Sequence, residues 1–251
     1  MNTLAPPRPA ALSTLWVLSF GHCCADLSSS ATSALLPFLV AQRHYSYAAV
    51  GIFVLASRIG GALLQPLIGH YGDRTGALWL MPVGLVVAGA GIGAVGLVND
   101  RSFALLAVAI CSLGVAAYHP EGARWARRAA GSTVASGMSI FSVGGSAGYA
   151  LGPLMVAGVV VPLGLRGTPL LMVLPVVAAV ALMILLRRLG AQAHDEMRAD
   201  RAQVGRLEEW GPFARLVTVN GIQSGMVSGL FAYVPLYLVA RGTSAGISNT
   251  M

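Results

Sequence analysis

Long apolar runs separated by short polar segments dominate the pattern along the chain. A transmembrane helix needs about 20 mostly apolar residues to cross the roughly 30 Å hydrocarbon core of a bilayer. Seven stretches approach or exceed that length, so the pattern predicts an all-α membrane protein. The predicted spans cover residues 12–39, 48–69, 78–98, 103–119, 134–161, 169–186 and 213–239.

The composition supports this interpretation and excludes an ordinary soluble domain. Of 251 residues, 56% are hydrophobic and 10% are charged, and the mean hydropathy is +0.73. Soluble chains average about 25% charged residues. Cys23, Cys24 and Cys111 all lie in apolar runs without CxxC spacing, which predicts neither a disulfide framework nor a zinc site. We expect no metal and no cofactor.

The charge distribution predicts the orientation of the chain. The 16 basic residues are all arginine, and with 9 acidic residues the net charge is +7. If the N-terminus is cytoplasmic, 11 arginines fall in inner segments, 4 in outer segments, and Arg58 within the second span. Excess positive charge inside is the usual topology signal of membrane proteins. We therefore predict a multi-pass protein of the bacterial inner membrane that binds no nucleic acid.

The same pattern predicts how the chain is divided. A charged linker separates six spans from the seventh, and the chain ends soon after that seventh span, as if it were truncated. The expected segments are a cytoplasmic N-terminus at 1–11, a six-helix bundle at 12–186, a cytoplasmic linker at 187–212, a seventh helix at 213–240 and an outer tail at 241–251.

The loop after the second span carries a recognisable motif. Gly69, Asp73, Arg74 and Gly76 fit the pattern G-x-x-x-D-R-x-G. Glycines permit a tight turn and close helix approach, and an aspartate can face a helix N-terminus or a nearby arginine. The loop resembles the signature of the major facilitator superfamily of transporters. That signature usually continues with basic residues, whereas residues 77–79 here are Ala, Leu and Trp.

The fifth span carries a ladder of small residues. Gly144, Gly148 and Gly152 recur on one helix face, which favours close helix packing, and Pro153 follows them. The G-x-x-x-G-P ending is similar to a motif of exporters in the same superfamily, and this resemblance implies export by antiport. The longer form of that motif has an earlier glycine, and Ser139 occupies the nearest position here.

Three stretches narrow the resemblance further. They read GHCCAD in span one, YHPE in span four and FSVGGSAGYALGPL in span five. Together they resemble the fosmidomycin resistance family of drug exporters. Members of that family have twelve helices in two halves, which implies that this chain supplies a six-helix N-terminal bundle plus one helix.

Ionisable residues within the spans are the candidate functional groups. His22 and Asp26 are four residues apart on one helix face, and Arg58 lies at a similar predicted depth. Charges at that depth are costly and usually functional. We expect these three side chains to form a midplane cluster with an Asp26–Arg58 pair, which serves either proton coupling or structure alone. His119 and Glu121, near the predicted inner end of span four, are either a proton-accessible acid and base or capping groups.

The polar residues also follow the arrangement expected of such transporters. Spans one, four and seven begin the three-helix repeats and line the cavity of transporters of this superfamily. In this chain, Asn220 and Gln223 provide the polar positions of span seven.

These observations predict a proton-coupled efflux antiporter of small polar or anionic drugs that works by alternating access. Its expected partners are a small-molecule substrate, protons, membrane lipid, and a missing C-terminal half or a second chain. Arg58 is the intramembrane cation available for a phosphonate or carboxylate. One alternative is a truncated fragment that does not transport. A membrane-embedded hydrolase using His119 and Glu121 is a third hypothesis, but the chain lacks the His-Glu-x-x-His and Gly-x-Ser-x-Gly motifs.

Overall fold

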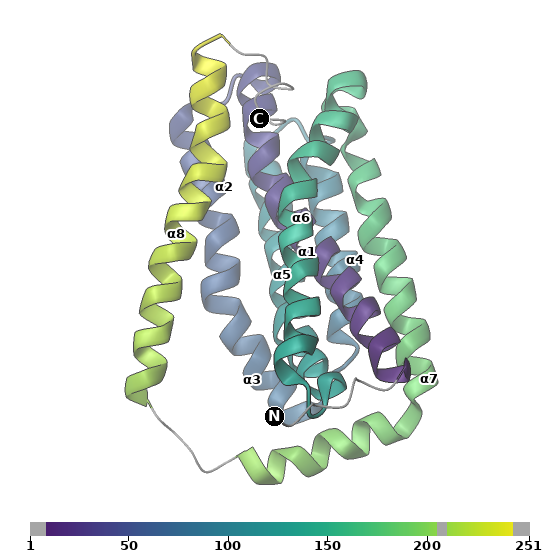
Figure 1. Ribbon diagram of the computed structural model, residues 1–251. Helices are drawn as coiled ribbons and strands as arrows, with labels where there is room; N and C mark the ends of the chain where they lie inside the picture. Colours follow the sequence, from purple (N-terminus) through teal and green to yellow (C-terminus); the bar gives the residue numbers. More distant parts are fainter. Residues whose placement is uncertain (1–8, 205–209, 243–251) are drawn as a thin grey trace.

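The computed structural model describes residues 9–204 and 210–242, and the regular structure in these ranges is helical. The long helical segments run in alternating directions along one bundle, and α3 continues in the direction of α2 (Figure 1). A π-helix, Gly60–Leu64, joins α2 to α3, and a 3-10 helix, Leu165–Met172, precedes α7. The α-helices are α1 Pro9–Arg43, α2 Tyr47–Ile59, α3 Gln65–Thr75, α4 Leu80–Val95, α5 Arg101–Ala130, α6 Val134–Leu163, α7 Val173–Val204 and α8 Trp210–Ala240.

Five helical segments in the described residues are long and apolar enough to cross a membrane, and two further apolar helices are shorter. The predicted second span corresponds to one of the shorter ones, because the π-helix interrupts the α-helical run from Tyr47 to Thr75. The predicted third span corresponds to α4, whose 16 residues end before Gly96. The chain is therefore an all-α membrane protein, as the sequence predicts.

Helix α1 forms the centre of the bundle. It packs along α6 and α5, whereas its contact with α2 is slight. Its second half is almost completely buried, including Leu27, Ala31 and Leu35. Such burial requires small residues on the neighbouring helices, because backbones can approach closely only where side chains are short.

Helix α5 is longer than the sequence analysis predicted. We expected span four to end at His119, but the helix continues through Pro120 to Ala130. Proline removes one backbone donor, and membrane helices tolerate this where neighbouring groups compensate. The helix ends instead at Gly131, whose φ of 54° few other residues adopt. As a consequence, His119 lies within the helix and not at its inner end.

The loops gather at the two ends of the bundle as the alternating spans require. At one end Arg43 reaches the loop after α4, where its guanidinium donates to the side chain of Asn99 and to the carbonyl of Gly96, the latter at 3.1 Å. At the other end, α7 does not stop at the predicted limit of span six, Leu186, but continues as a helix to Val204 (Figure 1). Residues 1–8, 205–209 and 243–251, which hold parts of the predicted terminus, linker and tail, lie outside the described residues.

Candidate functional site

Three ionisable side chains from two helices meet inside the bundle. On α1, Nε2 of His22 lies 3.3 Å from Oδ2 of Asp26. From α5, Nε2 of His119 lies 3.2 Å from Oδ1 of the same carboxylate. The side chains of His22 and Asp26 are each 12% exposed and that of His119 is 22% exposed, so the cluster is largely shielded from solvent. We call these three residues the His–Asp–His cluster.

Backbone carbonyls determine which ring nitrogens carry hydrogens. Nδ1 of His22 lies 2.8 Å from the carbonyl oxygen of Phe141, and Nδ1 of His119 lies 2.8 Å from that of Val115. A carbonyl oxygen can only accept a hydrogen bond, so each Nδ1 must donate. Each Nε2 then faces Asp26 as a bare lone pair unless it carries a second proton.

This arrangement has a defined proton capacity. An ionised carboxylate offers acceptors only, so both contacts of Asp26 are attractive when both imidazoles are protonated. A protonated Asp26 has one hydrogen to donate and satisfies one histidine. The geometry is therefore complete with two dissociable protons shared among the three side chains.

The same atoms are close enough for a single cation to contact all three. The candidate ligand atoms of His22, Asp26 and His119 lie within 4.8 Å of one another. We expected no metal site from the sequence on the basis of its cysteine spacing, and the two histidines are 97 positions apart. A divalent cation and two protons supply the same charge, and protons alone complete the hydrogen bonds described above.

Helix α6 forms the wall of the cluster. The ring of Phe141 stacks on His22 with 4.1 Å between centroids. Gly145 lies over the cluster: a methyl group in place of its hydrogen would be 2.6 Å from Oδ2 of Asp26 and 2.8 Å from Nε2 of His22. Beside them, the hydroxyl of buried Tyr118 donates to the carbonyl of Leu18 at 2.5 Å. The sequence analysis quoted Phe141 and Gly145 within the FSVGGSAGYALGPL stretch but gave neither a role at this site.

We predicted that Arg58 pairs with Asp26, but Arg58 is not part of the His–Asp–His cluster. In the described part of the chain, Asp26 pairs with the two histidines, and Nε of Arg58 is buried without a hydrogen-bond partner. The reason is helix packing, because α1 lies along α5 and has little contact with α2. Arg58 is the penultimate residue of α2, and one residue, Ile59, separates it from the π-helix Gly60–Leu64. Single-turn π segments are common at functional sites.

Glu121 does not contact the same residues as His119, although both lie on α5. Its side chain is completely buried, and Oε1 lies 2.7 Å from Nη1 of Arg124. A methyl group on Gly72 of α3 would collide with that carboxylate oxygen. Glu121 therefore packs against the G-x-x-x-D-R-x-G segment, which favours the structural interpretation of this residue over the acid–base one.

The signature segment ends as its glycines predict. Gly76 has a φ of 68°, and its N–H donates to the carbonyl of Gly72 at 2.9 Å, which closes α3. Gly69 faces Pro120 of α5, where an added methyl group would lie 3.4 Å from the proline ring. Arg74 is exposed, and the side chain of Asp73 lies outside the described residues. The sequence analysis did not single out Gly72 of this segment, which contacts Glu121.

The small-residue ladder on α6 forms the predicted close contact. Methyl groups on Gly144 and Gly148 would collide with the carbonyl oxygens of Ser19 and Cys23 of α1. On Gly152 a methyl group would collide with the hydroxyl of Ser30. Helix α6 continues past Pro153 to Leu163. This contact brings α6 against α1 along the whole length of the cluster, so the ladder positions Gly145 over Asp26.

The predicted polar face of the seventh span is only partly described. Gln223 of α8 is exposed, and the side chain of Asn220 lies outside the described residues. Helix α8 reaches the bundle mainly at α1, and Phe231 contacts Tyr149 of α6 with 5.9 Å between ring centroids. Whether Asn220 and Gln223 line a cavity stays a prediction.

The fold and the cluster together define a multi-pass helical membrane protein with a polar, ionisable centre. The family model of the Major Facilitator Superfamily matches residues 18–251. The chain therefore belongs to the major facilitator superfamily, which is a superfamily of transporters.

Similar proteins agree with this assignment. The chain is 30% identical to the fosmidomycin resistance protein of Escherichia coli (strain K12) over 180 residues, which cover 72% of this chain and 44% of that protein. It is 32% identical to the uncharacterized MFS-type transporter YfnC of Bacillus subtilis (strain 168) over 187 residues, which cover 74% of this chain and 44% of that protein. The matches thus span less than half the length of either relative.

A solved structure supports the fold alone. The crystal structure of tetrameric PepTSo2 in space group P4212 aligns with 92% of this chain and 52% of its own, with a TM-score of 0.53 and 14% sequence identity. A second crystal form of the same protein, in space group I4, gives a TM-score of 0.52.

Proposed function

We propose that the protein acts in proton-coupled efflux of small polar or anionic drugs such as fosmidomycin, in the inner membrane with a cytoplasmic N-terminus. The likeness to the fosmidomycin resistance protein supports the substrate class. The observation that carries the proton coupling is the His–Asp–His cluster, whose hydrogen bonds are complete only when it holds two dissociable protons.

The cluster is suited to carry protons because it lies inside a membrane protein and is still partly accessible. Ionisable residues at membrane depth are typical of proton pathways. The other titratable groups close to Asp26 are Cys23 and Tyr118. Neither supplies a second carboxylate. Asp26 is thus the acidic member of the proton site.

Arg58 is the proposed contact for an anionic substrate. A buried hydrogen-bond donor without a partner is costly, and a bound phosphonate or carboxylate would supply that partner. The unpartnered Nε of Arg58 supports this role. The adjacent π-helix offers backbone that can adjust as a substrate enters.

Antiport requires that bound protons weaken the binding of substrate. By linkage, bound substrate must then weaken the binding of protons by the same factor. Binding of fosmidomycin to the purified chain at constant pH should therefore release protons from the His–Asp–His cluster. Proton uptake on binding would contradict antiport and favour cotransport. Calorimetry in buffers of different ionisation enthalpy measures the number and sign of protons exchanged.

Transport is expected to need more protein than the described bundle. The chain aligns with 44% of each relative, and most described side chains of α8 are exposed. We propose that further helices, on the same polypeptide or on a second chain, close the other side of the cavity and allow alternating access.

The decisive test is fosmidomycin accumulation in everted membrane vesicles. Vesicles with the protein should accumulate the drug when a pH gradient is imposed, and a protonophore should abolish accumulation. Accumulation that survives the protonophore would contradict proton coupling. The assay is run with the chain alone and with the C-terminal half of the Escherichia coli relative on a second polypeptide. A requirement for that half supports the incomplete-cavity proposal, whereas no transport in either preparation supports the non-transporting alternative.

A further inference from the structure

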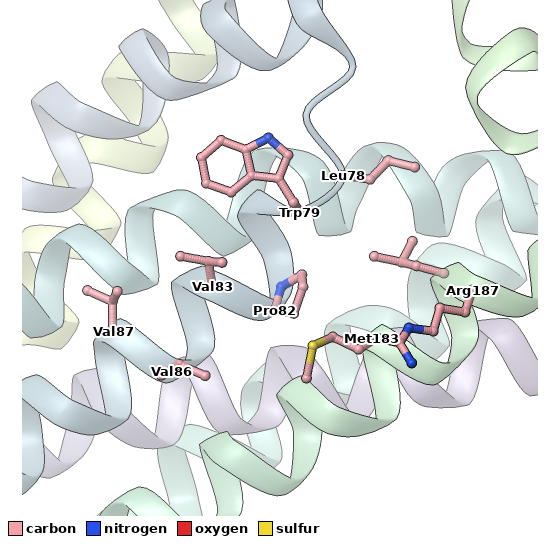
Figure 2. A pocket seen from close by; sticks show the side chains of 9 residues that line it. Leu78, Trp79, Pro82, Val83, Val86, Val87, Met183 and Arg187 are labelled. Carbon is pink, nitrogen blue, oxygen red and sulfur yellow. The ribbon is translucent and has the colours of Figure 1, made fainter. Parts of the chain in front are cut away.

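An apolar groove lies between the beginning of α4 and the end of the apolar part of α7. It encloses about 450 Å³. In Figure 2, Trp79, which precedes α4, and Pro82 and Val83 of α4 face Met183 and Arg187 of α7 across this groove. We call it the α4–α7 groove. Its lining residues are Leu78, Trp79, Pro82, Val83, Val86, Val87, Met183, Leu186 and Arg187.

The groove has a clear physical origin. The two helices touch closely at Gly89, where an added methyl group would lie 3.1 Å from Pro175. Between this contact and the turn at Gly76, larger side chains from both helices line a space between them. The apolar lining makes the space unfavourable for water.

The groove runs along the membrane direction from an interface inward. Trp79 directly precedes α4, and Val87 lies eight residues further along, or about 12 Å of helix. Half of a hydrocarbon core is about 15 Å thick. The groove thus follows most of the depth of one leaflet, so that part of an acyl chain can lie along it.

The interfacial end of the groove carries the recognition chemistry. Arg187 is the one charged residue in the lining, and no carboxylate among the described side chains pairs with it. Trp79, which is 55% exposed, lies across from it, and tryptophan is enriched at the headgroup level of membranes. Basic pockets between helices at that level suit anionic headgroups.

The position in the bundle leaves this groove open to lipid. Helix α8 packs against α1 on the side of α2, whereas α7 lies on the far side of the bundle (Figure 1). Further helices that follow α8 onto its side would leave the α4–α7 groove facing the bilayer.

We propose that the α4–α7 groove binds one anionic phospholipid, with the headgroup phosphate on Arg187 and an acyl chain along Val83 and Val87. A lipid fits this site because its phosphate can contact Arg187 at the interfacial end while its acyl chain lies in the apolar groove. This site is separate from the His–Asp–His cluster and does not depend on the transport proposal.

Native mass spectrometry of the delipidated chain, titrated with phosphatidylglycerol, tests the proposal. Arg187→Ala should weaken binding of the tightest lipid by about five-fold, which corresponds to roughly one arginine contact. Val83→Trp should fill the groove and abolish that binding. The matched controls are Arg188→Ala, which removes the adjacent exposed charge, and Val180→Trp, which enlarges an exposed valine of α7 outside the groove.

Further arms separate the lipid from other occupants. Glycerol phosphate, which has the headgroup chemistry without acyl chains, should not compete with the lipid. Phosphatidylcholine should bind more weakly, and Arg187→Ala should remove the difference. Equal lipid binding by Arg187→Ala and Arg188→Ala would overturn the proposal. A change of oligomeric state in Val83→Trp with lipid binding unchanged would also overturn it, because the groove would then be a protein interface.

Discussion

Asp26 of α1 and His119 of α5 are 93 positions apart in the chain, and a carboxylate oxygen of one lies 3.2 Å from Nε2 of the other. This contact changes the assignment of the site. The sequence paired Asp26 with Arg58, whereas the fold gives Asp26 a second histidine and leaves Nε of Arg58 without a hydrogen-bond partner.

Asp26→Asn should abolish proton-driven accumulation of drug while substrate exchange continues. Asparagine keeps the shape of the side chain but removes the negative charge that holds two protonated imidazoles together. Accumulation and counterflow in everted vesicles measure the two activities. Asp100→Asn is the matched control, because Asp100 caps α5 at the bundle surface and asparagine caps equally well. Full proton-driven transport in Asp26→Asn would show that the cluster is structural.

His119→Gln should reduce the number of protons exchanged per substrate from two to about one. A glutamine amide can donate to Asp26 but has no dissociable proton. Without those two protons, each Nε2 turns a lone pair toward the carboxylate and the contacts become repulsive. The pH dependence of transport should therefore be shallower in the variant. The stoichiometry follows from transport measured against imposed gradients.

The matched control for that experiment is His70→Gln, since His70 is exposed on α3. It should keep the wild-type ratio and pH profile. An unchanged ratio in His119→Gln would place the transported protons elsewhere.

Gly145→Ala should impair the cluster more than the fold. The added methyl group would meet Asp26 and His22 at 2.6 Å, so the side chains must shift, at a cost of about 1–3 kcal/mol. We expect the pH profile of transport to change even in protein that purifies as wild type. Gly158→Ala on the same helix has no neighbour within 4 Å and should raise stability by about 0.5–1 kcal/mol. Equal transport by the two variants would remove Gly145 from the site.

Glu121→Gln should lower stability but leave proton coupling intact. The substitution weakens a buried contact with Arg124, which costs on the order of 1–3 kcal/mol. Gly72→Ala should lower stability similarly, because its methyl group would displace the same carboxylate. Thermal unfolding in detergent and proton–substrate stoichiometry give the two readouts. Loss of coupling in folded Glu121→Gln would return this residue to the proton pathway.

The orientation of the bundle can be tested with two exposed serines at opposite ends. Ser132 lies between α5 and α6, and Ser102 lies at the start of α5. A membrane-impermeant thiol reagent on intact cells should label Ser102→Cys and not Ser132→Cys. The unmodified chain measures the background from Cys23, Cys24 and Cys111. The reverse labelling pattern would show that the bundle has the opposite orientation, with its N-terminus outside the cytoplasm.

The sequence by itself determined the class of protein and the places of its local motifs. Apolar runs of membrane length predict helices because hydrocarbon cannot hydrogen-bond a free backbone. The turn at Gly76 and the small-residue ladder of Gly144, Gly148 and Gly152 are likewise local, since they depend on backbone freedom and side-chain size within a few residues.

Only the tertiary structure decided which charges meet. Depth estimates placed Asp26 and Arg58 at one level, but a level in the membrane does not specify which face of a helix turns to which neighbour. That depends on the packing of α1 against α5 and α6, and on the continuation of α5 through Pro120, which together bring His119 to Asp26. The same packing directs Glu121 to Gly72 and gives Gly145 its place over the cluster, because contacts between distant residues arise only when the helices are assembled.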